Sequence, residues 1–400
     1  MANVSSSNGL EKRPKLRFPG FDEPYRTTPL GEIASLVNRT DPKSNAPIMM
    51  LSAGNGFIMQ SEKYSRDNAG QSLKKYILLK QGELAYNHGA SKAKQFGCCY
   101  ELTEPEARIP YVYHCFKIND HEYTPFIAMA LNNAKMDKQL KRLVSSSVRM
   151  DGLLNISFED YMSVTLHLPS STEQKHIADF LKKIDERIAA QEKLLASLKK
   201  YKRGVVKAIL SKRIRFADDR GNYYPEWSEC TLQEVVDFLD GQRKPLESAD
   251  RAKRQGKYPY YGASGIIDYI DDYIFDEPLL LLGEDGANII NRSSPLCFIA
   301  TGKYWVNNHA HVMRPRKGQN IKFICELLEN LDYTRYNTGT AQPKLNQEKC
   351  RQIALHLPTY EEQCHIAEFL SLVEQKSIHA QTELDSLLRT KNALMQQLFI

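Results

Sequence analysis

Two stretches of the chain repeat apolar residues with heptad spacing. In the first, one heptad position holds Ile177, Ile184, Leu198 and Val205, and its partner position holds Phe180, Leu194 and Tyr201. The second has Ile366, Val373, Ala380, Leu387 and Leu394, flanked by Phe369, Leu370, Leu384 and Leu398. No proline interrupts either series, so each predicts a helix of about 40 residues, roughly 60 Å long at 1.5 Å per residue.

The two stretches belong to a duplicated unit. Residues Leu166–Leu181 recur 189 positions later as Leu355–Leu370, and eleven of the sixteen positions are identical. Weaker echoes pair Leu30–Ala34 with Leu232–Val236, Ser52–Ile58 with Gly262–Ile267, and Leu154–Asn155 with Leu345–Asn346. The period is too long for a solenoid, so we interpret the chain as two copies of a globular domain followed by a long helix.

Each long helix begins with the same signals. Pro169 and Pro358 end a preceding strand, and Ser170-x-x-Glu173 and Thr359-x-x-Glu362 then predict capping boxes. A 60 Å helix with one apolar stripe needs a partner helix, and the nearest partner is the other copy. We therefore expect the two helices to pack antiparallel about a pseudo-two-fold axis. The alternative is that each helix packs only on its own domain.

The remaining sequence predicts an α+β fold. Runs rich in Val, Ile, Tyr and Phe alternate with Gly, Asn and Asp clusters, with short helices between them. The expected domain boundaries are 1–168 for the first globular domain, 169–212 for the central helix, 213–356 for the second globular domain and 357–400 for the distal helix. The expected architecture is thus two globular domains separated by two long antiparallel helices that form a coiled coil.

Composition narrows the class of protein. The chain has 400 residues, 42% hydrophobic and 26% charged, which excludes a disordered or collagenous protein. No run of 18 apolar residues predicts a membrane span, and no apolar segment near Met1 predicts a secretory signal, so we expect a cytoplasmic protein without membrane contact. Eight cysteines without a C-x-x-C pair predict reduced thiols. The formal net charge of +6 permits a polyanionic partner.

Catalytic motifs are missing from the sequence. It has no Walker loop, no G-x-S-x-G, no H-E-x-x-H, no glycine-rich loop typical of dinucleotide or methyl-donor sites, and no Asn/Asp-Pro-Pro-Tyr run. His309 and His311 share a strand face and could ligate a metal, but no third ligand is nearby in the sequence. We therefore expect no catalytic residue, no metal and no cofactor.

Basic and polar clusters instead indicate a recognition surface. Arg243, Lys244, Arg251, Lys253, Arg254 and Lys257 fall within fifteen residues, directly before Tyr258, Tyr260 and Tyr261. Such cations attract phosphates and neighbouring aromatic or amide groups can contact bases, although a merely solvated basic loop is the alternative. A second basic run, from Lys199 to Arg215, either follows a DNA backbone or covers a helix end.

Polar loops with hydrogen-bonding groups that suit base edges occur in both halves. The candidate DNA-binding residues of the first half are Asn87, His88, Ser91, Lys92, Lys94 and Arg149. Those of the second half are Arg243, Lys244, Arg254, Lys257, Tyr261, Ser264, Asn288, Arg292, Trp305, Asn307, Asn308, His309, Thr340, Gln342 and Lys344.

These residues resemble those of the specificity subunits of type I restriction–modification systems. The resemblance covers nearly the whole chain, and it is strongest in the repeated Leu-Pro-x-x-x-Glu-Gln-x-x-Ile-Ala-x-Phe-Leu segment, in Gly339–Asn346, in Tyr258–Gly265 and in Trp305–Val312. One departure is Ser145–Arg149, which replaces the Gln-Pro-Lys closing loop in the first half, so the contact role implied for that loop is in doubt.

The resemblance implies a division of labour between subunits. Each target recognition domain would read one half of a bipartite site in double-stranded DNA. The helices would set the spacer and dock two DNA adenine methyltransferase subunits, and restriction subunits would join the complex. The expected positions of the helix core or of partner docking are Ile177, Phe180, Leu181, Ile184, Leu198, Ile366, Phe369, Leu370, Val373 and Leu387.

Three other functions remain as alternatives. The chain could be a nuclease or methyltransferase in its own right, which turnover by the isolated chain would reveal. It could be a coiled-coil assembly protein without DNA affinity. It could also be the specificity subunit of a fused restriction–methylation enzyme, in which only the partner differs. The DNA sequence recognised and the spacer length do not follow from the sequence.

Overall fold

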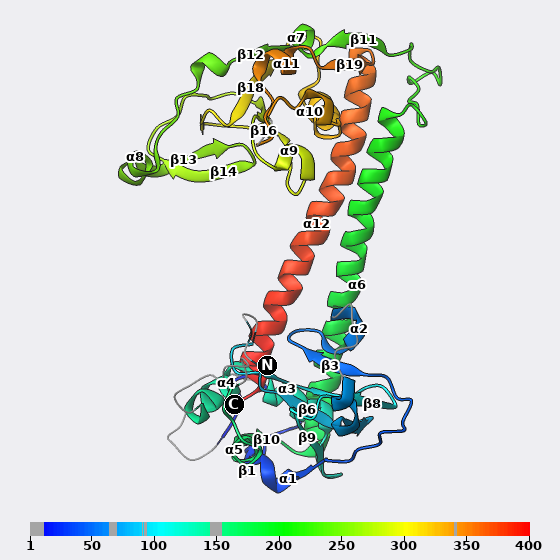
Figure 1. Cartoon of the computed structure of the whole chain (residues 1–400), viewed down its shortest axis with the longest axis vertical. Coiled ribbons are helices and arrows are strands. Elements are labelled where there is room, and N and C mark those ends of the chain that lie inside the picture. The colour runs from blue at the N-terminus through cyan, green and yellow to red at the C-terminus, as the bar shows by residue number, and fades with distance from the viewer. Residues whose placement is uncertain (1–11, 64–69, 90, 92–93, 145–153, 340–341) are drawn as a thin grey trace. The chain divides into compact units, whose positions relative to one another are not determined.

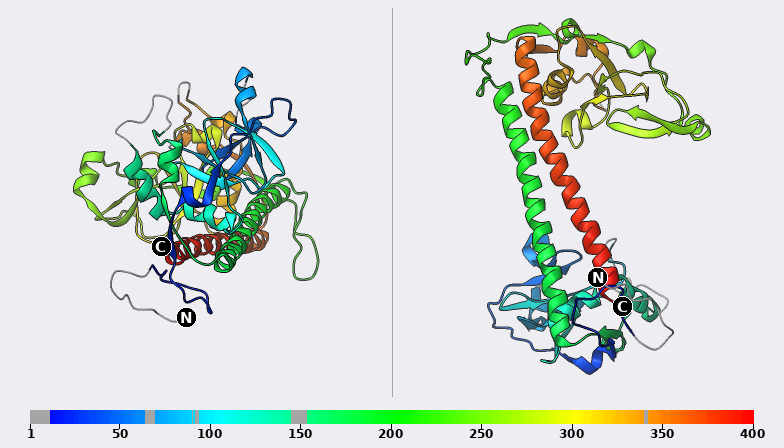
Figure 2. Two further views of the ribbon diagram at one scale, coloured as in Figure 1. Left: turned by 90° about the horizontal axis from the view of Figure 1, so that it is seen from below. Right: turned by 180° about the vertical axis from the view of Figure 1, so that it is seen from behind.

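The computed structural model describes residues 12–63, 70–89, 91, 94–144, 154–339 and 342–400. The chain divides into two units. The first combines the residues before 193 with residues 383–400, and the second consists of residues 193–382. The two long helices, α6 (Ser171–Leu210) and α12 (Tyr360–Leu398), each contribute to both units. Figure 1 shows α6 in green and α12 in red, and Figure 2 shows the same pair from two other sides.

The first unit is built around a four-stranded antiparallel sheet. Its strands lie in the order β2 (Ala34–Leu36), β9 (His114–Ile118), β6 (Leu84–Asn87) and β7 (Cys98–Glu101). Three two-stranded pairs accompany it: β1 (Arg26–Pro29) with β10 (Thr165–Leu168), β3 (Met49–Ser52) with β4 (Gly56–Met59), and β5 (Ile77–Lys80) with β8 (Glu106–Ile109). Its short helices are α1 (Leu30–Ile33), α2 (Gln60–Lys63), α3 (Thr124–Leu131), α4 (Ala134–Leu143), α5 (Phe158–Met162) and the 3-10 helix η1 (Gly70–Lys75).

The second unit repeats this plan. Its four-stranded sheet has the order β12 (Val236–Phe238), β18 (Ala310–Pro315), β15 (Leu279–Gly283) and β16 (Cys297–Ala300). A second sheet contains β14 (Gly265–Ile270), β13 (Gln255–Gly262) and β17 (Trp305–Val306), and β11 (Ser228–Thr231) pairs with β19 (Ala354–Leu357). The helices are α7 (Leu232–Val235), α8 (Ser248–Lys253), α9 (Asn288–Asn291), α10 (Ile321–Glu329) and α11 (Gln347–Arg351), with 3-10 helices η2 (Asp240–Gln242) and η3 (Thr334–Tyr336).

The strand registers confirm the internal repeat. In the first unit Leu36 and Leu84 both lie opposite Phe116, and in the second unit Phe238 and Leu280 both lie opposite Met313. The echo between Leu30–Ala34 and Leu232–Val236 corresponds to α1 and α7, each of which follows a paired strand. The echo between Ser52–Ile58 and Gly262–Ile267 corresponds to the turns of the hairpins β3–β4 and β13–β14. The expected α+β class and pseudo-repeat are therefore confirmed.

The buried stripe of α6 corrects one half of the predicted heptad. Ile177 is buried and Ile184 and Leu198 are half-buried, as expected. The partner position, however, lies one residue further along than predicted. Leu195 is only 7% exposed whereas Leu194 is 49% exposed. The observed partner series is Leu181, Ile188, Leu195, Lys202 and Ile209, while Phe180 and Tyr201 lie on the exposed flank. A spacing of four and then three residues keeps this series on the same stripe as Ile177.

The stripe of α12 follows the same register, displaced by 189 residues. Ile366, Leu370, Val373, Ala380, Leu384 and Leu398 are buried, and Phe369 and Leu387 are half-buried. Lys202 and Lys391 occupy equivalent core-edge positions, and both form ion pairs to the facing helix. Lys202 Nζ lies 2.7 Å from Glu374 in the second unit, and Lys391 pairs with Asp185 in the first. Asp185 and Glu374 are themselves 189 residues apart, so the ion pairs repeat along with the apolar stripe.

The direction of the helix pair follows from contacts inside the first unit. Asp185 pairs with Lys391, and Arg187, two residues further along α6, pairs with Glu383 at 2.9 Å. The residue numbers rise along α6 as they fall along α12, so the helices are antiparallel. This confirms the expected antiparallel arrangement.

The helix starts differ from the predicted capping boxes. Ser170 Oγ and Thr359 Oγ1 accept the amides of Glu173 and Glu362 at 3.3 and 3.4 Å, which is the expected first half of each box. The carboxylate of Glu173 does not complete the box; it accepts two hydrogen bonds from Arg17 at 2.8 and 2.9 Å. Glu173 is completely buried, so a guanidinium that matches both carboxylate oxygens is the stronger partner.

Residues 383–400 complete the core of the first unit. Leu398 and Phe399 are buried there, and the ring of Phe399 stacks on Phe126 with centroids 5.0 Å apart. The backbone carbonyl of Gln397 accepts from the amide of Leu16 at 3.1 Å. Segments from both halves of the sequence therefore form one core.

From the sequence we also expected reduced thiols and no membrane span. All eight cysteines are free, and five of them are buried. In the described part of the chain, no helix combines the length and apolarity that crossing a lipid bilayer requires.

The corrected helix register makes a direct prediction. Replacing Leu195 with Ala should lower the free energy of unfolding by about 2–5 kcal/mol, because it leaves a cavity in the seam. Replacing its neighbour Leu194 with Ala should change the free energy of unfolding by less than about 0.5 kcal/mol, because that side chain is exposed. Denaturant unfolding of the two variants measures both. Equal losses would mean that the seam lies on the originally predicted position.

Candidate nucleic-acid interface

Four segments of the second unit converge at one edge, which we call the readout edge. It comprises the β13–β14 turn (Gly262–Gly265), the segment after β15 (Glu284–Gly286), the β17–β18 turn (Asn307–His309) and Pro343–Lys344. The amide of Asn307 donates to Tyr261 O at 3.0 Å, and the amide of Glu284 donates to His309 O at 2.9 Å. A side chain at Gly283 would lie only 2.6 Å from Ala263 O, so glycine is needed for this close approach.

A buried network of charges supports the readout edge from behind. Asp240, only 7% exposed at its side chain, lies 2.7 Å from Nδ1 of the buried His311 and accepts the amide of Val312 at 2.8 Å. The other ring nitrogen of His311 lies 2.8 Å from Leu345 O. Arg243 donates to Glu284 at 2.9 Å and to Ala310 O at 2.7 Å. These contacts connect three of the segments to the central sheet.

The protonation state of His311 follows from its partners. Burial opposes the charge on the ring, but the hydrogen bonds and charges of Asp240 and Cys350 together outweigh it and raise the pKa of His311 from 6.5 to about 10. Burial likewise opposes the charge on Asp240, yet the hydrogen bond from His311 holds the pKa of Asp240 below its usual value. Both ring nitrogens face acceptor oxygens, which suits a doubly protonated ring.

The first unit has an equivalent histidine without the acid. Tyr86 lies opposite His114 as Leu282 lies opposite His311, so the two histidines are equivalent. His114 Nε2 lies 2.9 Å from Ile156 O, and Ile156 is 189 residues before Leu345. The position of Asp240 is occupied by Asn38, which is exposed. Burial accordingly lowers the pKa of His114, opposite to the shift of His311. The sequence marked His311 only as a possible metal ligand and did not indicate the observed pairings, because the partners of both histidines are a carboxylate and carbonyl oxygens far away in the chain.

The same carbonyls refine one predicted echo. Leu345 donates its amide to Glu284 O and accepts from His311. In the first unit these two roles are divided between Leu154, whose amide donates to His88 O, and Ile156, which accepts from His114. Leu154 therefore corresponds to Leu345 in its amide hydrogen bond, as predicted, whereas Ile156 corresponds to Leu345 in its carbonyl contact. The first unit has two extra residues at this point.

Several candidate residues of the second unit hold the structure together rather than face outward. Arg243 pairs with Glu284, Arg292 with Glu329 at 2.8 Å, and Arg254 with Asp271 at 2.9 Å. Trp305 is buried and its indole N–H donates to Lys244 O at 2.6 Å; Asn307 is buried and its Oδ1 accepts the amide of His309 at 2.8 Å. Asn288 donates to Ser294 O at 3.0 Å, and the half-buried ring of Tyr261 packs against Phe298 and Tyr304.

Other candidates of the second unit are exposed. They are Lys244, Lys257, Ser264, Asn308, His309, Gln342 and Lys344, whereas Thr340 lies outside the described residues. His309 lies 2.7 Å from Asp285, and Lys344 lies 3.5 Å from Glu284, so both are attached to the readout edge. Ser264 and Asn308 occupy two of its turns. Of the sequence candidates, these four residues are the ones that the fold brings together with exposed side chains.

The candidates of the first unit are mostly committed to internal contacts. The ring nitrogens of the buried His88 lie 2.9 and 3.0 Å from Leu154 O and Val112 O. Asn87 accepts the amide of Gly89 at 2.9 Å, and Lys94 donates to Asn132 O at 2.6 Å. Ser91 is exposed. Lys92 and Arg149 lie outside the described residues.

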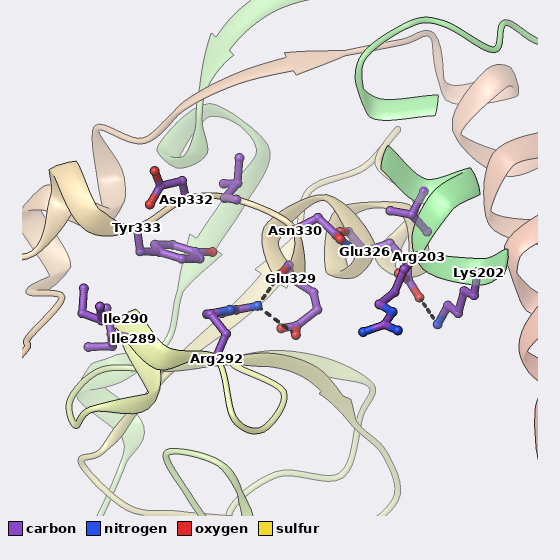
Figure 3. A pocket seen from close by; sticks show the side chains of 12 residues that line it. Lys202, Arg203, Ile289, Ile290, Arg292, Glu326, Glu329, Asn330, Asp332 and Tyr333 are labelled. Carbon is purple, nitrogen blue, oxygen red and sulfur yellow. Dashed lines mark hydrogen bonds and ion pairs between the residues drawn. The ribbon is translucent and has the colours of Figure 1, made fainter. Parts of the chain in front are cut away.

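Two further features of the second unit are the histidine pair considered above as metal ligands and a cavity beside α6. His309 and His311 bind different carboxylates, and no three His, Cys, Asp or Glu side chains gather into a metal-binding group within the described ranges. A cavity of about 520 Å³ lies between α6, α9 and the end of α10 (Figure 3). Four of the charged groups in its lining form two ion pairs, Lys202 with Glu326 and Arg292 with Glu329.

Comparisons with known proteins agree with the sequence resemblance. The family model described as "Type I restriction modification DNA specificity domain" matches residues 74–200 and 224–389. A Haemophilus influenzae protein named as a type I restriction enzyme specificity subunit is 33% identical over 145 residues, which is 36% of this chain and 36% of that protein. The EcoprrI specificity subunit of Escherichia coli is 28% identical over 146 residues, which is 36% of this chain and 35% of the relative. The matches thus span about a third of the length of both relatives.

Solved structures share the fold. The S subunit of a type I restriction–modification system from M. genitalium aligns with a TM-score of 0.61 at 16% identity, covering 97% of this chain and 99% of that one. A chain from a study of complex assembly and conformational transition of the type I R-M system aligns with a TM-score of 0.55 at 15% identity, covering 95% and 98%.

The buried ion pair behind the readout edge predicts a pH dependence. Since the pKa of His311 is raised to about 10, its stabilising contribution is complete below pH 6.5 and is lost as the pH rises toward 10. Asp240→Asn should weaken this pH dependence, because Asp240 is one of the two groups that raise the pKa of His311, and should lower the free energy of unfolding at pH 6.5 by about 3–5 kcal/mol. Denaturant unfolding between pH 6 and 10 measures both effects.

Asp237→Asn serves as the matched control, because Asp237 and its partner Arg316 are about half exposed. That variant should lose at most about 1 kcal/mol of unfolding free energy. The assignment would be wrong if Asp240→Asn kept the parent's pH dependence.

Proposed function

Because the chain belongs to the family of type I restriction modification DNA specificity domains, we propose that it is the DNA-recognition subunit of a restriction–modification complex. Each unit reads one half of a bipartite site in double-stranded DNA. The antiparallel helix pair, α6 with α12, fixes the spacing between the half-sites.

The duplicated fold is the observation that carries this proposal. Both units contain the same four-stranded sheet, with loops at the corresponding strand ends, and both long helices contribute to both units. Two related but differently equipped readers suit a site whose halves differ in sequence. A protein that only assembled partners would not need two such sheets with divergent loops.

The exposed residues of the readout edge supply the base contacts in this proposal. Asn308 and Ser264 offer hydrogen-bonding groups suited to base edges, and Lys344 and His309 add donors beside them. The side chains of Lys244, Lys257 and Gln342 are also exposed. In this proposal they contact phosphates or bases beside the readout edge. Arg243, Arg254, Asn288, Arg292, Trp305, Asn307 and Tyr261 position these loops. Asn87, His88 and Lys94 act likewise in the first unit, with Ser91, Lys92 and Arg149 as its contact residues.

In this proposal, other subunits catalyse the methylation and cleavage of the DNA. We infer that two DNA adenine methyltransferase subunits dock on the helices, that restriction subunits join them in the cytoplasm, and that this chain is not itself catalytic. The flanks of the helix seam, including Phe180 and Phe369, provide docking positions beside the buried Ile177, Leu181, Ile366, Leu370 and Val373. The proposed boundaries remain residues 1–168 and 213–356 for the readers, and 169–212 and 357–400 for the helices.

An exchange of readers tests the proposal. Replacing residues 216–355 with the corresponding segment of a relative should change one half of the methylated sequence and leave the other half unaltered. Mapping of methylated adenines in cells that carry the complex measures this. Two unaltered half-sites, or changes in both, would contradict modular reading.

A pair of neighbouring asparagines tests the readout edge itself. Asn308→Ala should weaken binding to the mapped target by about 10- to 100-fold and relax the preference at one base pair, without changing the unfolding midpoint. Asn307→Ala should instead destabilise the fold by about 1–3 kcal/mol, because it removes the acceptor of the His309 amide. DNA binding and thermal unfolding of both variants distinguish the two roles. A specificity change in neither variant would exclude this turn from base reading.

A further inference from the structure

The basic run on α6 separates into paired and unpaired cations. Residues 196–216 contain eight Lys or Arg and no Asp or Glu. Lys202 pairs with Glu326 and Glu374, Arg215 pairs with Glu226, and Lys212 lies over the Trp227 ring. Lys199, Lys200, Arg203 and Lys207 are exposed, and no ion pair with a described acid is recorded for them.

Three of these cations form a row on the helix surface. Lys199, Arg203 and Lys207 are four residues apart, so they lie on one side of α6 at steps of about 6 Å along its axis. We call this row, together with Lys200, the cationic face. Exposed like charges at this spacing repel each other and destabilise the helix slightly. Their accumulation therefore calls for a ligand rather than for a role in folding.

The internal repeat provides a control for that argument. The positions of α12 that lie 189 residues after Lys199, Arg203 and Lys207 hold Leu388, Asn392 and Gln396, and only the position after Lys200 keeps a basic residue, Arg389. α12 has the same core register and the same length to within one residue, yet it has no basic residue in its last turn. Helix-dipole compensation also fails to explain the row, since that effect is confined to the last turn and only Lys207 lies there.

One residue of the cationic face, Arg203, faces a helix that follows the readout edge in the chain. Arg203 lines the cavity shown in Figure 3, opposite Ile289 and Ile290 of α9, and the figure shows no ion pair for its guanidinium. α9 begins at Asn288, two residues after Gly286 of the readout edge. The cavity therefore has Arg203 on one side and, on the other, the helix that directly follows one segment of the readout edge.

We propose that the cationic face of α6 binds the phosphate backbone of the DNA duplex beside the half-site read by the second unit. This inference rests on the proposed function. A duplex supplies a regular row of negative charges, which matches several cations one helical turn apart. Such contacts add affinity without reading sequence, so the second unit holds its half-site with phosphate contacts that the corresponding part of α12 lacks.

Salt dependence of DNA binding tests the proposal. The full chain would be titrated with a duplex of arbitrary sequence at several salt concentrations, because phosphate contacts need no particular target. The triple variant K199Q/R203Q/K207Q should reduce the slope of log K against log salt by about 2–3, near 0.9 per lost phosphate contact. The matched control K182Q/K183Q/K376Q removes three exposed lysines elsewhere on the same helices and should leave the slope within about 1 of the parent.

The outcomes separate this inference from the proposed function. If the parent chain binds the duplex and the triple variant keeps its slope, the cationic face does not bind DNA and the proposed function stands. A triple variant that keeps its slope but no longer binds the methyltransferase subunit would assign the face to an acidic protein partner, which also overturns the proposal. No binding by the parent would contradict the proposed function itself. An unchanged thermal unfolding midpoint in the triple variant confirms that folding is unaffected.

Discussion

The helix seam is the constraint on which the rest of the structure depends. A helix of 40 residues with one apolar stripe is stable only when a second helix covers that stripe. The ion pairs repeat with the stripe, because Lys202 and Lys391 occupy equivalent positions and face acids that are also equivalent. Duplication thus explains why one chain can supply both halves of an antiparallel pair. When two copies of this helix pack antiparallel, each covers the apolar stripe of the other and supplies the acid that pairs with the lysine of the other.

The two units share a fold but differ in the charged groups that hold their loops in place. Each has a histidine, half-buried His114 or buried His311, whose ring nitrogen contacts the carbonyl before the last short helix, and among the described residues only His311 has an acid, Asp240, at its other nitrogen. The second unit therefore supports its loops with a buried ion pair, whereas the first uses contacts to backbone carbonyls, such as those of His88. Buried charges tolerate little displacement, because each must keep its partner. Loops mounted on such a network are fixed in position more strictly than loops mounted on apolar packing.

The sequence predicted the repeat, the long helices and the α+β class because these features leave periodic or repeated patterns. The heptad partner position was predicted one residue too early, because Phe180, Leu194 and Tyr201 are apolar but exposed, and hydrophobicity alone does not report burial. The glutamate of the predicted capping box binds Arg17, which lies 156 residues away and leaves no local signal. For the candidate site, residue type pointed to loops that the fold brings together at the readout edge, but could not separate exposed side chains such as Asn308 from structural ones such as Asn307.

The nesting of the two units has a consequence for biosynthesis. The second unit is one continuous segment, residues 193–382, so it can fold as soon as that segment leaves the ribosome. The first unit must wait, because Leu398 and Phe399 belong to its core and are translated only after the whole second unit. Until then, the apolar surface around Phe126 stays uncovered. The earliest-made half of the protein is thus the last to mature, and a chain cut short by premature termination would present that uncovered surface to the quality-control machinery of the cell.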